Sequence, residues 1–254
     1  MCVSQRSYDR DWCTLGTLPH WNVALATVQN HLIELLPTQA RLRLLRLCEP
    51  VNLAMSDVLS EVGKPTPYIY FPVNGFISLV TVIDGKPVLE VGMVGREGMV
   101  GVQLVLGITI TPLHAVVQGP GKAWRIGTRI FARELNRSAD LRRGLNRYLY
   151  VLMGQLASAA SCLRFHAIGP RLARWLLMTH DRAHADAFHV THEFLAYMLG
   201  VRRVGITTAA KSLQRRGLIE YRRGEMRVLD RRALEAAACS CYAIEQDAYA
   251  RLLD

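Results

Sequence analysis

The chain has 254 residues, half of them hydrophobic, which is enough to bury a sizeable core in one large domain or, as we expect, two smaller ones. No apolar run approaches the length of a membrane span and the first residues lack the pattern of a secretory signal, so the sequence predicts a cytoplasmic protein with no membrane partner. The formal net charge of +10 favours a polyanionic partner, although excess charge can also serve solubility.

The positive charge is concentrated near the C-terminal end of the chain. Residues 51–124 carry four Lys or Arg against five acids, whereas residues 202–232 carry ten Lys or Arg against three acids. This difference predicts one strongly basic module.

The cysteines and histidines do not predict a metal site. Six cysteines spread through a chain expected to be intracellular favour free thiols over a disulfide framework. Only Cys239 and Cys241 are close in sequence, and on a predicted C-terminal helix this spacing points two thiols to different faces. We expect solvated or capping roles for the four histidines that gather around the domain linker: His180, His184, His189 and His192.

The pattern of residue types changes along the N-terminal half of the chain. Residues 1–30 show little periodicity and predict an irregular segment, and the following leucines predict two short helices separated by Pro37. Short β-branched and aromatic runs then alternate with tight-turn signals at Asn74-Gly75, Asp84-Gly85 and Gly119-Pro120-Gly121. This pattern predicts a small antiparallel barrel or jelly roll.

A long helix is predicted after the barrel. Thr128 is expected to cap a first helix and Asp140 the longer one that follows. Leucines in the longer helix repeat close to a heptad, which favours a parallel dimer of coiled-coil type; a helix packed against its own domain remains the alternative. The predicted dimer contacts are Leu145, Leu149, Leu152, Leu156 and Leu163.

The basic module has the order of a winged helix-turn-helix. Thr191 is expected to cap a short helix, Gly200 to supply the turn, and a second helix to run from about Arg202 to Arg216. A hairpin about Arg223-Gly224 would form the wing and contact phosphates. The alternative is a helical hairpin with a solvated basic face. The predicted DNA contacts are Arg202, Arg203, Val204, Thr207, Thr208, Lys211, Arg222 and Arg223.

The segment THEFLAYMLGVRRVGITTAAKSLQRRGLI closely resembles the helix-turn-helix of bacterial Crp/Fnr regulators, and YIYFPVNGFISLV and GMVGREGMVGVQLVLG resemble their effector barrel more weakly. The resemblance implies an α+β chain: an N-terminal cyclic-nucleotide-binding-type β jelly roll (31–135), a long dimerisation helix (136–168) and a C-terminal winged helix-turn-helix (169–254). It also implies that Arg203, Val204 and Thr208 occupy base-contacting positions, of which only Arg203 keeps the residue of the cyclic-AMP receptor.

The resemblance implies an effector site that departs from the family pattern. Glu97 matches the glutamate that holds a ribose hydroxyl, although it can also be a solvated turn carboxylate. His114 stands where an Arg-Ser pair would bind the cyclic phosphate, so cyclic AMP is not favoured. Cys2 and Cys13 alone do not make the set that an iron–sulfur cluster needs, and no cofactor is predicted.

We therefore expect a transcription regulator that acts as a homodimer on palindromic promoter sites under the control of an unidentified signal. The expected partners are double-stranded DNA, a second copy of the chain, RNA polymerase and an unknown small-molecule effector. The alternative is a signal-independent DNA-binding or architectural protein whose barrel serves only dimerisation and protein contacts. An enzyme is not expected, because the sequence has no HExxH, GxSxG or P-loop motif.

Overall fold

The computed structural model describes residues 30–84, 86–183 and 185–253, without the side chains of residues 86 and 87. The predicted irregular segment 1–30 therefore lies outside the described residues except for Asn30. The buried side chain of Asn30 caps the first helix by accepting from the backbone N–H of Ile33, and it donates to the carbonyls of Pro72 (2.8 Å) and Gly98 (3.0 Å). These bonds fix the start of the described chain to the barrel.

Two short helices lead into the barrel, as predicted. They are α1 (His31–Glu34) and α2 (Thr38–Leu47), and Pro37 is the residue before α2. None of the helices in the described part of the chain is long and apolar enough to cross a bilayer.

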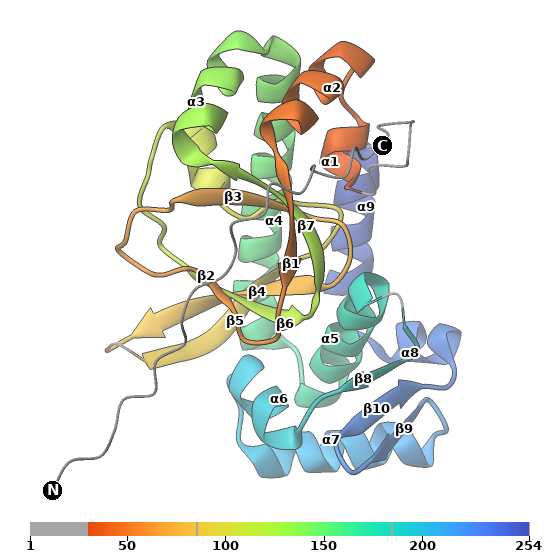
Figure 1. Ribbon diagram of the computed structural model, residues 1–254. Helices are drawn as coiled ribbons and strands as arrows, with labels where there is room; N and C mark the ends of the chain where they lie inside the picture. The colour runs from red at the N-terminus through yellow and green to blue at the C-terminus, as the bar shows by residue number, and fades with distance from the viewer. Residues whose placement is uncertain (1–29, 85, 184, 254) are drawn as a thin grey trace, which may run out of the picture.

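Seven strands form two antiparallel sheets of a jelly-roll barrel (Figure 1). One sheet has the order β1-β7-β3 and the other β2-β6-β4-β5. Two of the three predicted turns are confirmed by left-handed backbone at Gly75 (φ 74°) and Asp84 (φ 51°). The barrel elements are β1 (Glu49–Leu53), β2 (Val58–Ser60), β3 (Tyr68–Pro72), β4 (Phe76–Ile83), β5 (Lys86–Val94), the 3₁₀ turn η1 (Val102–Leu106), β6 (His114–Gly119) and β7 (Gly121–Gly127).

Helices α3 (Thr128–Arg137) and α4 (Ala139–Phe165) follow, but their caps differ from the prediction. The Thr128 hydroxyl donates to the carbonyl of Thr66 (2.5 Å), so it ties α3 to the barrel and caps nothing. Ser138 caps α4 by accepting from the backbone N–H of Leu141 (3.2 Å), whereas Asp140 lies inside the first turn. A hydroxyl two positions earlier therefore performs the role expected of Asp140.

Two of the five leucines predicted as dimer contacts, Leu145 and Leu152, are instead buried against the barrel. Leu145 (2% exposed) packs with Phe71 and Phe131, and Leu152 (4% exposed) packs with core residues from both sheets. These two leucines stabilise their own domain and are not available to a partner. Leu149 and Leu156 are half-buried and Leu163 is exposed, at the border of the covered face.

A second domain lies beneath the barrel and has the winged helix-turn-helix order (Figure 1). Its three strands form a sheet of order β8-β10-β9. Its core includes Phe76 and Met93 of the barrel, so the two domains share buried apolar surface. The elements are α5 (Ile168–Ala183), β8 (Ala187–His189), α6 (His192–Met198), α7 (Arg203–Arg215), β9 (Ile219–Arg222) and β10 (Glu225–Val228).

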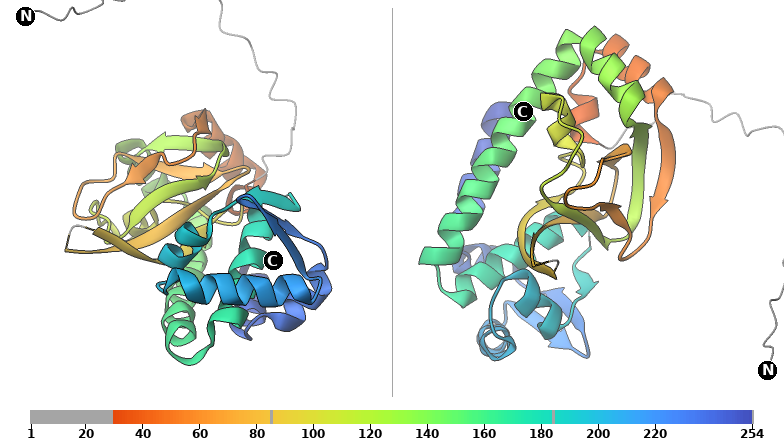
Figure 2. Two further views of the ribbon diagram at one scale, coloured as in Figure 1. Left: turned by 90° about the horizontal axis from the view of Figure 1, so that it is seen from below. Right: turned by 90° about the vertical axis from the view of Figure 1, so that its left-hand side faces the viewer.

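Two further helices follow the wing: α8 (Arg231–Ala237) and α9 (Cys241–Leu253). Helix α9 runs back along α4 towards the top of the barrel (Figure 1; Figure 2, right). Tyr249 stacks on His31 with 5.7 Å between ring centroids, and Leu253 joins the core formed with α1 and α3. The C-terminal helix thus connects the second domain to the far end of the first.

Candidate nucleic-acid interface

Helices α6 and α7 are held in a helix-turn-helix by local signals that the sequence predicted. The Thr191 hydroxyl accepts from the backbone N–H of Phe194 (3.1 Å) and so caps α6. Gly200 has φ 61° and forms the turn. Ile206 and Leu213 of α7 are buried in the domain core, which fixes the opposite face of α7 towards solvent.

The N-terminal end of α7 presents the predicted contact residues. Arg202 is the residue before the helix, no side chain caps the first turn, and Arg202, Arg203 and Val204 are all exposed. Seen from below, α7 lies across the surface with no element in front of it (Figure 2, left). Exposed backbone N–H groups and the positive end of the helix dipole favour an anionic ligand such as a phosphate.

Farther along the same face, Thr208 and Lys211 are exposed and Thr207 is half-buried. The Thr207 hydroxyl donates to the carbonyl of Arg203 (3.1 Å) and lies 3.1 Å from Nδ1 of His192. The Thr208 hydroxyl donates to the carbonyl of Val204 (3.0 Å) but keeps its outward position. The structure therefore places Thr207 against α6 and leaves Thr208 and Lys211 facing outward beside the arginines.

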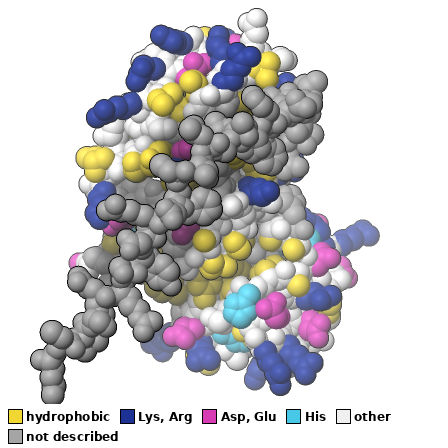
Figure 3. Space-filling view, in the orientation of Figure 1, with side chains coloured by type: hydrophobic (Ala, Val, Ile, Leu, Met, Phe, Trp, Pro, Cys, Tyr) yellow, Lys and Arg dark blue, Asp and Glu magenta, His cyan; other side chains and the backbone are white. Residues whose placement is uncertain are grey.

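The wing carries the second basic group. Arg222 and Arg223 are exposed at the tip of the β9-β10 hairpin, where Arg223 has φ 53° and Gly224 has φ 88°. Figure 3 shows Lys and Arg side chains gathered at the lower edge of the molecule, where these elements lie. Arginines on a hairpin tip suit contacts to the phosphate backbone, which add affinity without sequence information.

His192 and Tyr221 form a contact that the sequence did not indicate. Their rings stack with 4.2 Å between centroids and 16° between planes, so the first residue of α6 is joined to the wing. Burial, followed by the nearby charges of Arg203 and Lys211, lowers the pKa of His192. The imidazole thus contacts α7 through Thr207 and the wing through Tyr221. His192 and Tyr221 are far apart in sequence, and no spacing pattern connects them.

The two predicted effector residues make different contacts. The Glu97 carboxylate accepts from the backbone N–H of Gly95 (3.0 Å) and forms an ion pair with the guanidinium of Arg182 at 2.7 Å. Arg182 belongs to α5 and is buried. His114 lies on β6, paired with Val80 of β4. Glu97 is therefore not a solvated turn carboxylate; it links the barrel to the second domain through Arg182.

Glu97 also lines a cavity between the two domains. The cavity has a volume of about 390 Å³ and is bordered by residues of the barrel, α4, α5, α8 and α9, among them Arg182, Tyr242 and Tyr249. Charged side chains and tyrosine hydroxyls make up much of its wall. A small polar molecule is the kind of ligand that such a cavity could hold.

A second polar contact joins β5 to α5. The Glu90 carboxylate accepts from the indole N–H of Trp175 (2.8 Å) and from the hydroxyl of Ser78. Burial raises the pKa of Glu90 to about 7, although both hydrogen bonds act in the opposite direction. A barrel carboxylate that titrates near neutral pH therefore lies in the contact between the domains.

The turn of the helix-turn-helix itself rests on the barrel. A Cβ atom added at Gly200 would lie 2.9 Å from Cδ1 of Leu89 on β5 and 4.0 Å from Cδ1 of Leu163 on α4. The glycine is thus needed for its positive φ and for the close approach of the barrel. Movement of β5 or of the end of α4 would act directly on the element that positions α7.

Comparisons with known proteins agree with this arrangement. The model of the Crp-like helix-turn-helix domain matches residues 170–237, and no curated protein sequence matches the chain. Among solved structures, the c-di-GMP-responsive global regulator CLP of Xanthomonas campestris is 19% identical with a TM-score of 0.61, covering 76% of this chain and 99% of CLP.

Two other solved structures are similar. FixK2 of Bradyrhizobium japonicum is 14% identical with a TM-score of 0.63, covering 76% of this chain and 98% of FixK2. A transcriptional regulator of the CRP family from Thermus thermophilus is 19% identical with a TM-score of 0.60, covering 74% of this chain and 96% of that regulator. Residues 170–237 are therefore a Crp-like helix-turn-helix domain, and the chain has the fold of the Crp/Fnr transcription regulators.

Proposed function

We propose that this protein is a sequence-specific transcription regulator that binds palindromic promoter sites as a homodimer and responds to a signal at its N-terminal domain. The observation that carries the proposal is the exposed N-terminal end of α7, with Arg202, Arg203 and Thr208 on one outward face beside the basic wing. An α-helix that enters the major groove needs donors of this kind near its N-terminus.

A second copy of the chain is the partner proposed for α4. Its exposed face carries Tyr150 (68% exposed) and Met153 (61% exposed), followed by Ala157 and Ala160. These positions repeat at intervals of three, four and three residues, and small residues allow a partner helix to approach closely. The proposed seam is thus displaced around the helix from the buried leucines, and Leu149, Leu156 and Leu163 would border it.

The dimer proposal is tested by Met153→Arg. A charge on each of two facing helices repels and is costly to bury, so we expect sedimentation at micromolar concentration to show a monomer, whereas the unaltered chain sediments as a dimer. Ile83→Arg, which changes an equally exposed apolar residue on the barrel, is the control and should remain dimeric. A Met153→Arg protein that stays fully dimeric would refute the seam.

Signal control is supported by the contacts between the domains. The Glu97–Arg182 ion pair, the Glu90–Trp175 hydrogen bond and the packing of Leu89 near Gly200 all join the barrel to the DNA-binding domain. A ligand alters the position of α7 only if it binds two arrangements of these domains with different affinity. The interdomain cavity beside Glu97 is the proposed place for such a ligand.

DNA binding is tested by selecting bound duplexes from a random library and measuring their affinity. We expect a palindrome whose half-sites lie about 34 Å apart, with affinity that falls steeply as salt rises. Arg203→Ala should relax one symmetric base position and cost about 1–3 kcal/mol for the selected site. Arg223→Ala on the wing is the matched control, because a lost phosphate contact weakens all duplexes alike. Equal affinity for selected and scrambled duplexes would refute sequence-specific binding.

A further inference from the structure

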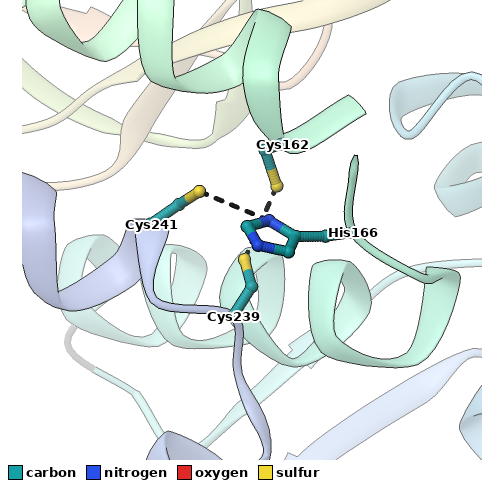
Figure 4. Close-up of side chains that lie close together, drawn as sticks. All are labelled: Cys162, His166, Cys239 and Cys241. Carbon is teal, nitrogen blue, oxygen red and sulfur yellow. Dashed lines mark hydrogen bonds between the residues drawn. The ribbon is translucent and has the colours of Figure 1, made fainter. Parts of the chain in front are cut away.

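Four side chains from two segments of the sequence, residues 162–166 and 239–241, meet where α4 ends and α9 begins (Figure 4). Cys162 lies on the last turns of α4, His166 follows the helix, Cys239 lies between α8 and α9, and Cys241 is the first residue of α9. The Sγ atoms of Cys162 and Cys239 are 3.5 Å apart, and Sγ of Cys241 is 3.5 Å from Nδ1 of His166. All four potential ligand atoms lie within 4.8 Å of one another.

This separation fits a single tetrahedral metal ion. Zn–S bonds of about 2.3 Å and Zn–N bonds of about 2.0 Å place the ligand atoms of a tetrahedral zinc site roughly 3.5–3.8 Å apart. Three thiolates and one imidazole form one of the ordinary ligand sets of structural zinc sites, whereas Mg²⁺ and Ca²⁺ prefer oxygen ligands. Both the spacing and the softness of the ligands therefore favour Zn²⁺.

The surroundings are also suited to a thiolate-rich site. Cys162, Cys239 and Cys241 are buried in a cluster of their own, and His166 is half-buried. The guanidinium groups of Arg171 and Arg174 are close enough to interact electrostatically with Cys162 and Cys239. Three thiolates and a divalent cation leave one negative charge, which nearby arginines would help to offset.

The peptide that presents the ligands is fixed on both sides. The backbone N–H of Cys239 donates to the carbonyl of Pro170 on α5 (3.3 Å), and Arg174 forms a buried ion pair with Glu245 of α9. The ligand positions are thus set by the fold and need little rearrangement around an ion.

We propose that Cys162, His166, Cys239 and Cys241 bind one Zn²⁺ ion that fastens α9 to the end of α4. The proposal differs from the expectation of no metal ligands because Cys239 precedes α9, so its thiol can turn to the same side as that of Cys241. Because α9 also packs on α5 and its Tyr249 hydroxyl donates to the backbone carbonyl of Glu97 in the barrel, the ion would stabilise the observed position of the DNA-binding domain. The proposal is independent of DNA binding, and its test requires no DNA.

Metal content and cobalt spectroscopy of the full-length protein, purified anaerobically with a reductant, test the proposal. We expect one zinc ion per chain, release of thiol protons when Zn²⁺ is added to the metal-free protein, and intense visible bands of tetrahedral Co²⁺ with thiolate-to-cobalt charge transfer. Cys241→Ser and His166→Gln should each weaken Zn²⁺ binding about 100-fold or more. Cys48→Ser and a Cys2→Ser/Cys13→Ser double variant are controls and should bind as the unaltered chain does.

A second measurement uses only the unaltered chain, so its result does not depend on whether the variants fold. Hydrogen exchange of the unaltered chain should slow in residues 239–253 when Zn²⁺ is added and should be unchanged by Mg²⁺. The proposal is overturned if the reduced protein binds no metal, if Co²⁺ spectra show octahedral oxygen ligation, or if ligand variants bind as tightly as the controls. A Cys162–Cys239 disulfide that forms in the presence of reductant and excludes Zn²⁺ would also overturn it.

Discussion

Replacing Glu90 by Gln should stabilise the protein above neutral pH and leave its stability nearly unchanged near pH 4.5. The carboxyl group has a pKa of 4.5 when solvated, and burial raises the pKa in the folded protein to about 7. Between these two values the folded state holds a proton that the unfolded state has released, so the free energy of unfolding falls as pH rises through this window. Above pH 7 the cost of burying the carboxylate is fully present.

The magnitude follows from the difference between the two pKa values. One pKa unit corresponds to about 1.36 kcal/mol, so the difference between 4.5 and about 7 corresponds to about 3 kcal/mol. Glutamine carries no charge to desolvate, its amide oxygen can still accept from the indole N–H of Trp175, and its amide nitrogen can donate to the Ser78 hydroxyl. The variant should therefore gain up to about 3 kcal/mol over the original protein at pH 8.

Urea unfolding at pH 4.5, 6, 7 and 8, followed by tryptophan fluorescence and circular dichroism, measures this effect. Glu220→Gln, which changes an exposed carboxylate on the wing, is the control and should alter stability by less than about 0.5 kcal/mol at every pH. A stability difference that is independent of pH, or a Glu90→Gln protein less stable than the original at pH 8, would show that burial of the carboxylate is not the source of the effect.

Two further predictions concern the other contacts between the domains. Glu97→Gln leaves the buried guanidinium of Arg182 without its charged partner and should lower the free energy of unfolding by about 3–5 kcal/mol; an unchanged urea midpoint would contradict this. Gly200→Ala and Gly217→Ala each place a side chain at positive φ, costing roughly 1–2 kcal/mol, but only Gly200 also faces Leu89, so urea unfolding should show the larger loss for Gly200→Ala.

Local patterns in the sequence were sufficient to predict the helix-turn-helix. Thr191 and Gly200 are signals for a helix start and a tight turn, and both act within a few residues of their own position. The same reasoning failed at Thr128, whose hydroxyl donates to the distant carbonyl of Thr66, and at Asp140, because the hydroxyl of Ser138 caps α4 in its place. Cap signals predict where helices begin more reliably than which side chain makes the bond.

The leucines of α4 show why a heptad repeat alone could not predict which residues of the helix contact a second copy of the chain. A helix that packs against its own barrel and a helix that pairs with a second copy both repeat apolar residues every three or four positions. The burial of Leu145 and Leu152 assigns this stripe to the barrel, and the exposure of Tyr150 and Met153 identifies the other face. The spacing predicted an apolar face correctly, and only tertiary structure could say what covers it.

The contacts that sequence patterns missed share one property: each joins parts of the chain that are far apart. His192 meets Tyr221, Glu97 meets Arg182, and Cys162 meets the thiols near the start of α9. Neither the spacing nor the type of these residues predicts such contacts before the fold is known.

All three contacts lie on or beside the elements that position α7. The stack supports α7 from the wing, the ion pair holds α5 against the barrel, and the thiol cluster holds the end of α4 against α9. A change at any of them shifts the balance between domain arrangements only by its own difference in free energy between those arrangements. Because Glu90 contacts Trp175 of α5 and its charge costs the folded protein up to about 3 kcal/mol above pH 7, we expect the stability of this contact between the domains to depend on pH.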